Sequence, residues 1–297
     1  MKLHNFLLIF SLGMIVLVIL MVWFLPLDED FRVENPLWNG FKNLSEDYAV
    51  QPVESFANLP SSKDATLIVV PYLEFTQEEL SELDRFIRDG GRIILADDYG
   101  YGNQVLEYLG TDVKFSGDTL QDPLANYNSP YLPKIIHFNT HVLTADLDNL
   151  GLNHATCLLN TDNSGTLALS SSFSFLDTNG NGQYDEEEPL GPLPVIFRKG
   201  MGKGELFLVA DPSLFINSME TMGENETFIR NIAADTTSLY IDQSHLPPSD
   251  LHRSKDLIAR GREFIAEPLI ATGLVALVVV ISLKPVWYRK KQHFKEE

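Results

Sequence analysis

The chain has 297 residues, a formal net charge of −19 and a single cysteine, Cys157. The length is sufficient for one large or two small domains. The acidic balance argues against binding to nucleic acid, which needs a basic face. One cysteine excludes an internal disulfide, so the fold must be stabilised by its core or by a bound ion.

Two apolar runs lie near the ends of the chain. Residues 6–25 carry no charge and are long enough to cross a hydrocarbon core of about 30 Å. No small-residue cleavage site follows them, which favours an uncleaved anchor. Residues 268–283 are also uncharged and lead to Trp287, Tyr288 and the basic residues 289–291, a pattern typical of a membrane interface. The sequence therefore predicts two transmembrane helices.

The flanking charges predict an orientation for these two runs. The C-terminal tail is rich in Lys and Arg, whereas residues 28–30 are all acidic, and basic flanks stay in the cytoplasm. We expect a two-pass membrane protein with cytoplasmic termini, an extracytoplasmic central domain, and the lipid bilayer and other membrane proteins as partners. The expected divisions are an anchor at 1–26, an α/β domain at 27–243, a linker at 244–263, a second membrane helix at 264–287 and a basic tail at 288–297.

Residues 64–98 form the clearest folding unit in the sequence. Residues 66–70 are an unbroken apolar run typical of a buried strand. Thr76 and Glu79 have the spacing of a capping box, and the apolar residues of 80–87 recur at helical spacing. Gly90 then favours a helix end, and residues 92–96 form a second apolar strand. Strand, helix and strand of these lengths predict a right-handed parallel unit.

The remaining pattern alternates strands with helices. This alternation predicts an α/β fold built on a doubly wound, mainly parallel sheet with an antiparallel hairpin addition. The glycine-bearing residues 200–204 are expected to be the hairpin turn, and 117–133 a mobile flap. Expected helices are 35–44, 103–109 and 225–239, expected strands are 48–53, 113–115, 134–138, 155–159, 166–175, 195–199 and 205–210, and 244–261 is read as a polar linker.

Residues 177–188 match the pattern of a calcium-binding loop. Oxygen-bearing side chains occupy its ligand positions, and Gly182 stands where the chain must turn sharply. A preceding strand and the prolines that follow do not fit a helix–loop–helix hand. The sequence predicts a structural calcium ion, with a solvated acidic turn as the alternative, and the expected ligands are Asp177, Asn179, Asn181, Gln183, Asp185 and Glu188.

Acidic and hydroxyl side chains follow three of the predicted strands. In open α/β sheets, ligands bind at the carboxyl ends of the strands. These side chains are therefore candidates for one ligand-binding crevice, although such residues also cap helices and close turns. The candidates are Asp97, Asp98, Tyr99, Asp211 and Ser213.

Nucleophilic catalysis has little support in the sequence. Cys157 lacks the flanking glycines of a nucleophile elbow and is expected to be a buried strand residue. His137 and His141 lie in a segment that reads as extended, so we expect both to be structural.

Two runs carry a resemblance to a known family. Residues 65–97 and the run GKGELFLVADPSLFINSMETMGENETFIRNI resemble membrane-anchored proteins that contain a degenerate class I glutamine-amidotransferase-like domain. Gliding-motility and intraflagellar-transport accessory domains are more distant relatives. The resemblance covers about 35–239 and implies a flavodoxin-like sheet that lacks the amidotransferase cysteine–histidine–glutamate set.

Three functions are consistent with these observations. The leading hypothesis is a non-enzymatic, anchored component of a membrane or envelope assembly that binds a ligand or partner. The first alternative is a hydrolase that acts on an envelope polymer through paired carboxylates, which would need two carboxyls about 5–9.5 Å apart across an open cleft. The second is a purely structural scaffold.

The calcium prediction has a direct test. A structural ion in residues 177–188 would raise the melting temperature in millimolar calcium, the affinity range of extracellular modules. Asp177→Ala would abolish that rise because it removes the first ligand. Calorimetry of both proteins measures the effect, and an unchanged melting temperature in calcium would contradict the prediction.

Overall fold

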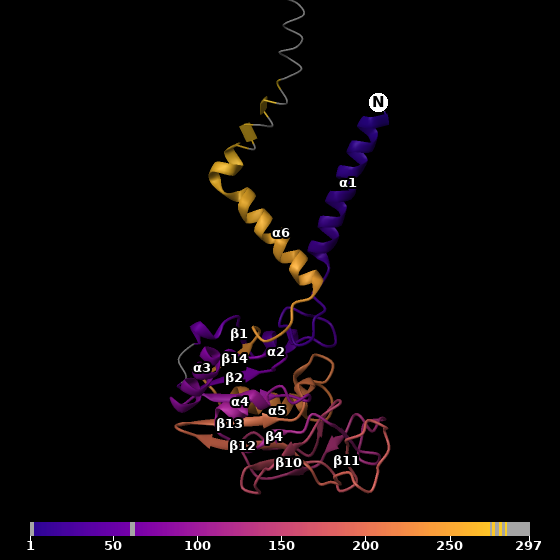
Figure 1. The fold of residues 1–297 in the computed structure, drawn as a ribbon, viewed down its shortest axis with the longest axis vertical. Coiled ribbons are helices and arrows are strands. Elements are labelled where there is room, and N and C mark those ends of the chain that lie inside the picture. The colour runs from indigo at the N-terminus through magenta and orange to yellow at the C-terminus, as the bar shows by residue number, and fades with distance from the viewer. Residues whose placement is uncertain (1–2, 60–62, 274, 277–278, 281–282, 284–297) are drawn as a thin grey trace, which may run out of the picture. The chain divides into compact units, whose positions relative to one another are not determined.

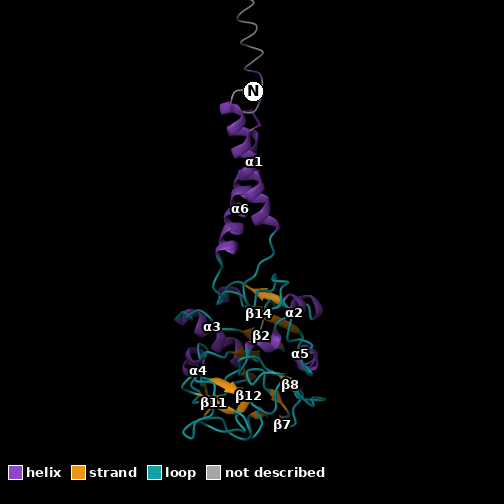
Figure 2. Ribbon diagram, turned by 90° about the vertical axis from the view of Figure 1, so that its right-hand side faces the viewer, coloured by secondary structure: helices purple, strands orange, loops and turns teal. Residues whose placement is uncertain are grey.

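A computed structural model describes residues 3–59, 63–273, 275–276, 279–280 and 283 of the chain. Two compact units are distinguished, one formed by residues 26–247 and one by residues 1–25 with 248–297. Each unit is described by itself. Figures 1 and 2 give the elements in two views related by a quarter turn.

The larger unit is built on an eight-stranded sheet with the order β1-β14-β2-β3-β13-β12-β10-β7. Across the sheet, the first five strands of this order, β1 to β13, pair in parallel with their neighbours. The remaining neighbours, from β13 through β12 and β10 to β7, pair antiparallel. The strands are β1 (Gln51–Val53), β2 (Ala65–Val69), β3 (Arg92–Ala96), β7 (His137–Phe138), β10 (Thr166–Leu169), β12 (Pro194–Met201), β13 (Gly204–Val209) and β14 (Ser238–Asp242).

The unit formed by β2, α3 (Gln77–Arg88) and β3 confirms the sequence prediction for residues 64–98. Thr76 and Glu79 make the reciprocal capping box, with the Glu79 side chain accepting from the Thr76 N–H at 2.8 Å. The apolar side of α3 is buried and packs on β3 and β13. Local signals alone determine this unit, because cap, repeat and helix end all lie within it.

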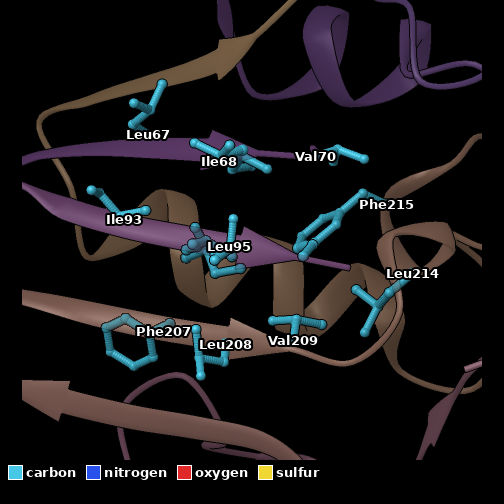
Figure 3. Close-up of a cluster of buried hydrophobic side chains, with 14 of the residues drawn as sticks. Leu67, Ile68, Val70, Ile93, Leu95, Phe207, Leu208, Val209, Leu214 and Phe215 are labelled. Atoms are coloured by element: carbon cyan, nitrogen blue, oxygen red, sulfur yellow. The ribbon is translucent and has the colours of Figure 1, made fainter. Parts of the chain in front are cut away.

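The core lies along the central parallel strands (Figure 3). Leu67, Ile93 and Leu95 are fully shielded from solvent, as are Phe207 and Leu208 to within 1%. These strands are apolar on both faces, as expected where layers cover both sides of a parallel sheet.

The other elements of this unit surround the sheet. The helices are α2 (Lys42–Asp47), α4 (Asn103–Tyr108), α5 (Asn225–Ala234) and the short 3-10 helices η1 (Phe56–Asn58) and η2 (Pro212–Phe215). Three two-stranded sheets pair β5 with β11, β4 with β9 and β6 with β8. Their strands are β4 (Lys114–Phe115), β5 (Thr119–Gln121), β6 (Lys134–Ile135), β8 (Leu150–Gly151), β9 (Leu158–Leu159) and β11 (Phe175–Asp177).

Three local predictions are wrong. The predicted flap, 117–133, contains β5, which pairs with β11, and it buries Gln121 and Asp122. The predicted helix 35–44 is helical only from Lys42, where α2 begins; before it the chain turns so tightly that a Cβ on Gly40 would be 2.0 Å from the Asn35 carbonyl oxygen. The predicted helix 225–239 ends at Ala234, and β14 follows it.

The predicted fold class needs a correction. In place of a mainly parallel sheet with a hairpin addition, the structure has a mixed sheet in which three antiparallel pairs follow four parallel ones. The hairpin itself is present, since β12 and β13 pair from Ile196 and Val209 down to Met201 and Gly204. The antiparallel part is larger because β10 and β7 extend the sheet beyond this hairpin.

The predicted pair of transmembrane helices is wrong. Over the ranges that the structure describes, none of the helices combines the length and the apolar character needed to cross a membrane. The smaller unit holds α1 (Leu3–Phe24) and α6 (Asp250–Ala266). The polar linker predicted at 244–261 is largely α6, which carries charged side chains on successive turns, among them Arg253, Lys255, Asp256, Arg260 and Arg262.

The membrane topology built on those helices is overturned with them. The second predicted span, 268–283, begins only after α6 has ended, and parts of it lie outside the described residues, as does the basic tail. The predictions of a two-pass membrane protein, cytoplasmic termini and a membrane location are therefore wrong. Within the smaller unit, Arg262 lies over the Trp23 ring at 5.6 Å from its centroid.

A buried histidine connects β14 to α3. His245 Nδ1 lies 2.6 Å from Asp242 Oδ2, and its Nε2 lies 3.7 Å from Glu79 Oε2. The ring stacks on Phe75 with 3.8 Å between centroids. Since the His245 carbonyl also accepts from the Tyr72 N–H, this residue holds the chain just beyond β2 in place.

His245→Ala is expected to lower the free energy of unfolding by about 2–4 kcal/mol, because it leaves the buried Asp242 carboxylate without its ring partner and opens a cavity beside Phe75. Urea denaturation of the full chain measures the change. The matched control is His137→Ala on the exposed side of β7, where a surface substitution is expected to cost less than about 0.5 kcal/mol. Equal stability of the two variants would contradict the role given to His245.

Candidate functional site

Three parallel strands bring polar residues to one edge of the sheet. Val209 pairs with Ala96, and Leu95 pairs with Val69, so β2, β3 and β13 end at the same level. Tyr72 follows β2, residues 97–99 follow β3, and residues 211–213 follow β13. This is the edge at which open α/β sheets bind ligands.

Asp97 closes the turn that leads from β3 into α4. One carboxylate oxygen accepts from the N–H groups of Tyr99 and Gly100 at 2.9 and 3.1 Å, and the other accepts from Gly102 at 2.6 Å. Burial raises the pKa of Asp97, although these three N–H groups act in the opposite direction. Both oxygens are occupied, so Asp97 positions the loop.

Asp211 has a comparable role after β13. It is fully buried, and as the N-terminal cap of η2 it accepts from the Ser213 N–H at 2.7 Å. Its other oxygen accepts from the Asn153 N–H at 2.6 Å, which attaches a distant loop to the strand end. Burial raises its pKa to about 7 against the effect of these donors.

Asp98 differs from both neighbours. Its Oδ1 is buried and has no hydrogen-bond partner among the groups that the structure describes. Burial, followed by the charges of Asp211 and Asp97, raises the pKa of Asp98 to about 8. A buried polar atom without a partner costs free energy. Asp98 is therefore the carboxyl group at this edge that is free to bind something else.

Asp98 lines a crevice of about 320 Å³. Volumes of about 300 Å³ and above are typical of small-molecule sites. Aromatic and polar side chains surround the crevice, and no lysine or arginine is among the described residues that line it. The lining residues are Asp30, Phe31, Trp38, Asn39, Tyr72, Asp98, Tyr99, Asn153, His154, Ser213 and Ile216.

The predicted ligand-binding residues divide into two groups. Asp98, Tyr99 and Ser213 line the crevice, whereas Asp97 and Asp211 hold the loops that form its walls. Whether any of them binds a ligand stays a prediction.

Sequence reasoning missed the aromatic wall contributed by the N-terminal segment and by the loop at Asn153. Trp38 is 66% exposed, and Phe31 and His154 adopt positive φ angles of 62° and 53°. Non-glycine residues in this region are uncommon and often occur at functional sites. An exposed tryptophan in a turn-forming segment, Asn35-Pro-Leu-Trp-Asn-Gly, was the one local signal for this wall.

The residues that could supply a nucleophile or a histidine base lie elsewhere. Cys157 is fully buried, and burial raises its pKa to about 12, so its thiol is protonated at neutral pH. His137 is exposed on β7, and His141 lies against the ring of Phe207. None of these three residues lines the crevice.

The predicted calcium loop follows β11. Asp177 accepts from Gln121 Nε2 and from the Asn181 and Gly182 N–H groups, and Asp185 accepts from the side chains of Asn179 and Asn181. Glu188 accepts from the N–H groups of Thr178 and Asp185.

No group of three or more His, Cys, Asp or Glu side chains arranged to hold a metal occurs in the described portion of the chain. The calcium-binding loop is thus without support from the structure, and the assignment of Asp177, Asn179, Asn181, Gln183, Asp185 and Glu188 as ligands stays a prediction.

The fold and the crevice together define an α/β domain with a mixed sheet and a small-molecule-sized crevice at the carboxyl ends of its parallel strands. Within that class, residues 35–233 match the family DUF4350, described as a domain of unknown function, and the chain belongs to this family. None of the curated proteins matches the chain significantly.

Solved structures give weaker similarities. The mmIFT52 N-terminal domain is 16% identical over 55% of this chain and 73% of its own, with a TM-score of 0.43. A cytoplasmic protein from Salmonella typhimurium LT2 is 14% identical over 63% and 75%, with a TM-score of 0.36. A beta-galactosidase from Bacillus circulans sp. alkalophilus is 12% identical over 58% of this chain but only 22% of its own, with a TM-score of 0.36.

The predicted resemblance is therefore supported in its coarser form, as membership of DUF4350 with structural similarity to an IFT52 N-terminal domain. Membrane anchoring and an amidotransferase-like domain are not shown. At these TM-scores the solved structures carry no inference about function.

Asp97→Asn is expected to lower the free energy of unfolding by about 1–3 kcal/mol, because the new amide nitrogen faces backbone donors in a buried turn. Asp98→Asn is the matched control, since it removes a half-buried carboxyl whose buried Oδ1 accepts no hydrogen bond. At pH 8 we expect it to be neutral or stabilising. Urea denaturation of both variants measures the difference, and an equal loss in the two would contradict the roles assigned to these neighbours.

Asp98 should also make stability depend on pH. Its pKa rises from an ordinary 3.8 to about 8 on folding, so the folded state holds an extra proton between these values. The contribution of protonated Asp98 to the free energy of unfolding is fully present below pH 3.8 and is lost as the pH rises toward 8. Asp98→Asn cannot lose a proton at this position. Its free energy of unfolding, relative to that of the wild type, is therefore expected to increase as the pH rises from 3.8 to about 8. A constant difference from pH 4 to pH 8 would contradict the raised pKa of Asp98.

Proposed function

We propose that this domain binds a small ligand in the crevice at the ends of β2, β3 and β13 and does not transform it. The observation that carries the proposal is the unpartnered, buried Oδ1 of Asp98 in a crevice of about 320 Å³. A ligand that donates a hydrogen bond or a positive charge there would offset the cost of burying that oxygen.

The roles of the neighbouring carboxylates support binding without catalysis. Asp97 accepts from three backbone N–H groups, and Asp211 accepts from two. A catalytic carboxylate needs oxygens that reach the reacting atoms, and these are committed to loops. The buried, protonated thiol of Cys157 fits a degenerate amidotransferase-like domain, which we propose as the finer form of the resemblance.

A hydrolase remains the second candidate because of one observation. Asp98, with a pKa of about 8, is protonated at neutral pH beside a second carboxyl group. A protonated carboxyl close to another one is the arrangement of a general acid in glycoside hydrolysis. The third candidate, a purely structural scaffold, is less favoured because side chains do not fill the crevice.

Ligand binding is testable through Trp38, which lines the crevice. Titration of the full chain with a panel of sugars, amino acids, organic amines and dipeptides is expected to change tryptophan fluorescence saturably for at least one class. Trp38→Phe should abolish the signal, because Trp38 is the tryptophan among the described residues that line the crevice.

Prolonged incubation separates binding from catalysis. The bound compound should be recovered unchanged by mass spectrometry. Consumption of a panel compound by the wild type but not by Asp98→Asn would contradict a purely binding role and favour the hydrolase. Absence of any saturable signal would contradict ligand binding itself.

A further inference from the structure

Resting on the proposed function, we propose that the ligand of the crevice is an organic cation, whose ammonium group lies between the Asp98 carboxylate and the surrounding aromatic rings. The crevice described above supplies both partners of such a group, namely negative charge and π faces.

The charges at the crevice favour a cation. Asp30 and Asp98 line it, Asp211 lies close enough to raise the pKa of Asp98, and lysine and arginine are absent from its described lining. A ligand phosphate or carboxylate would find no cationic partner here. The formal charge of −19 adds a long-range attraction for positive ligands.

The aromatic rings favour an organic cation over a metal ion. Tyr72 and Tyr99 meet edge to face with 6.1 Å between centroids, and Phe31 stacks on Tyr72 at 5.4 Å. Trp38 and Tyr99 are exposed by 66% and 60%, so ring surface is accessible. A cation within about 6 Å of such a face is attracted by the negative potential of the ring.

A metal ion would need more oxygens than this crevice offers. Calcium takes about six to eight oxygen ligands, while the carboxylate oxygens of Asp97 and Asp211 already accept hydrogen bonds from backbone N–H groups. In the parts of the chain that are described, no cluster of three or more His, Cys, Asp or Glu residues is arranged for a metal.

Binding of a cation should be coupled to proton release. The groups that surround Asp98 from the packed elements are Asp97, Tyr99 and Tyr72 at the strand ends, Asp211 after β13, and Asp30 and His154 in the crevice walls. The carboxyl groups among them disfavour a further negative charge, and a bound cation reverses that balance. With a pKa of about 8 in the free protein, Asp98 then loses its proton on binding at neutral pH.

The test uses choline as the probe cation and 3,3-dimethylbutan-1-ol, its neutral isostere. Isothermal titration of the full chain is expected to give saturable choline binding, at least about tenfold weaker for the alcohol, since a carboxylate attracts only the cation. Choline affinity should rise about tenfold or more from pH 6 to pH 8, because ionised Asp98 becomes more abundant. Titrations in buffers of different ionisation enthalpy should detect the released proton.

Three variants localise the effect. Asp98→Asn and Trp38→Ala should each weaken choline binding about tenfold, because they remove the charge or a ring. Asp112→Asn, an exposed acidic residue outside the crevice, should bind choline as the wild type does.

The outcomes distinguish the inference from the proposed function. Equal binding of choline and the alcohol, or binding of a neutral panel compound without choline binding, would overturn the cation assignment and leave crevice binding intact. Binding that Asp98→Asn and Asp112→Asn reduce equally would also overturn it. If no compound binds at all, both proposals fail.

Discussion

The parallel register between β3 and β13 is the constraint on which the crevice depends. Because Val209 pairs with Ala96, the two strands end together and place Asp98 and Asp211 at one edge of the sheet. Burial of carboxyl groups is costly unless donors accompany them. Asp211 receives two backbone N–H groups, whereas Asp98 Oδ1 receives none. That asymmetry distinguishes a carboxyl group that organises loops from one that remains available.

The walls of the crevice come from segments far apart in the sequence. Arg32, which is buried, donates to the carbonyl oxygens of Gln243 and Leu246 and so holds the N-terminal segment against the chain that follows β14. The Asn153 N–H donates to Asp211 and brings the loop with His154 to the lining of the crevice. Two residues of these walls have left-handed backbone conformations, which neighbouring contacts must stabilise. The crevice is thus a product of tertiary structure.

Sequence reasoning predicted what local signals determine. The strand–helix–strand unit of residues 64–98 and the hairpin at 200–204 each carry their own cap or turn. It failed where contacts with distant parts of the chain determine the secondary structure. Strand β14 follows directly after α5 and is a strand because β1 and β2 pair with it. Hydropathy of a window likewise predicted membrane helices, whereas none of the helices in the described residues is long and apolar enough to cross a membrane. The strand-end carboxylates could be predicted because they directly follow strands in the sequence. Trp38 and His154 could not, because only the tertiary structure brings them beside those carboxylates.

Asp98 carries an available carboxyl group whose Oδ1 is buried, and the titration of this group tests that assignment most directly. Carboxyl carbon NMR of the full chain, assigned through Asp98→Asn, measures the pKa of this side chain. The account predicts a pKa of about 8 in the free protein and a marked decrease when a ligand occupies the crevice. A pKa near the ordinary 3.8 in the free protein would show that Asp98 is solvated or partnered, and would contradict the account.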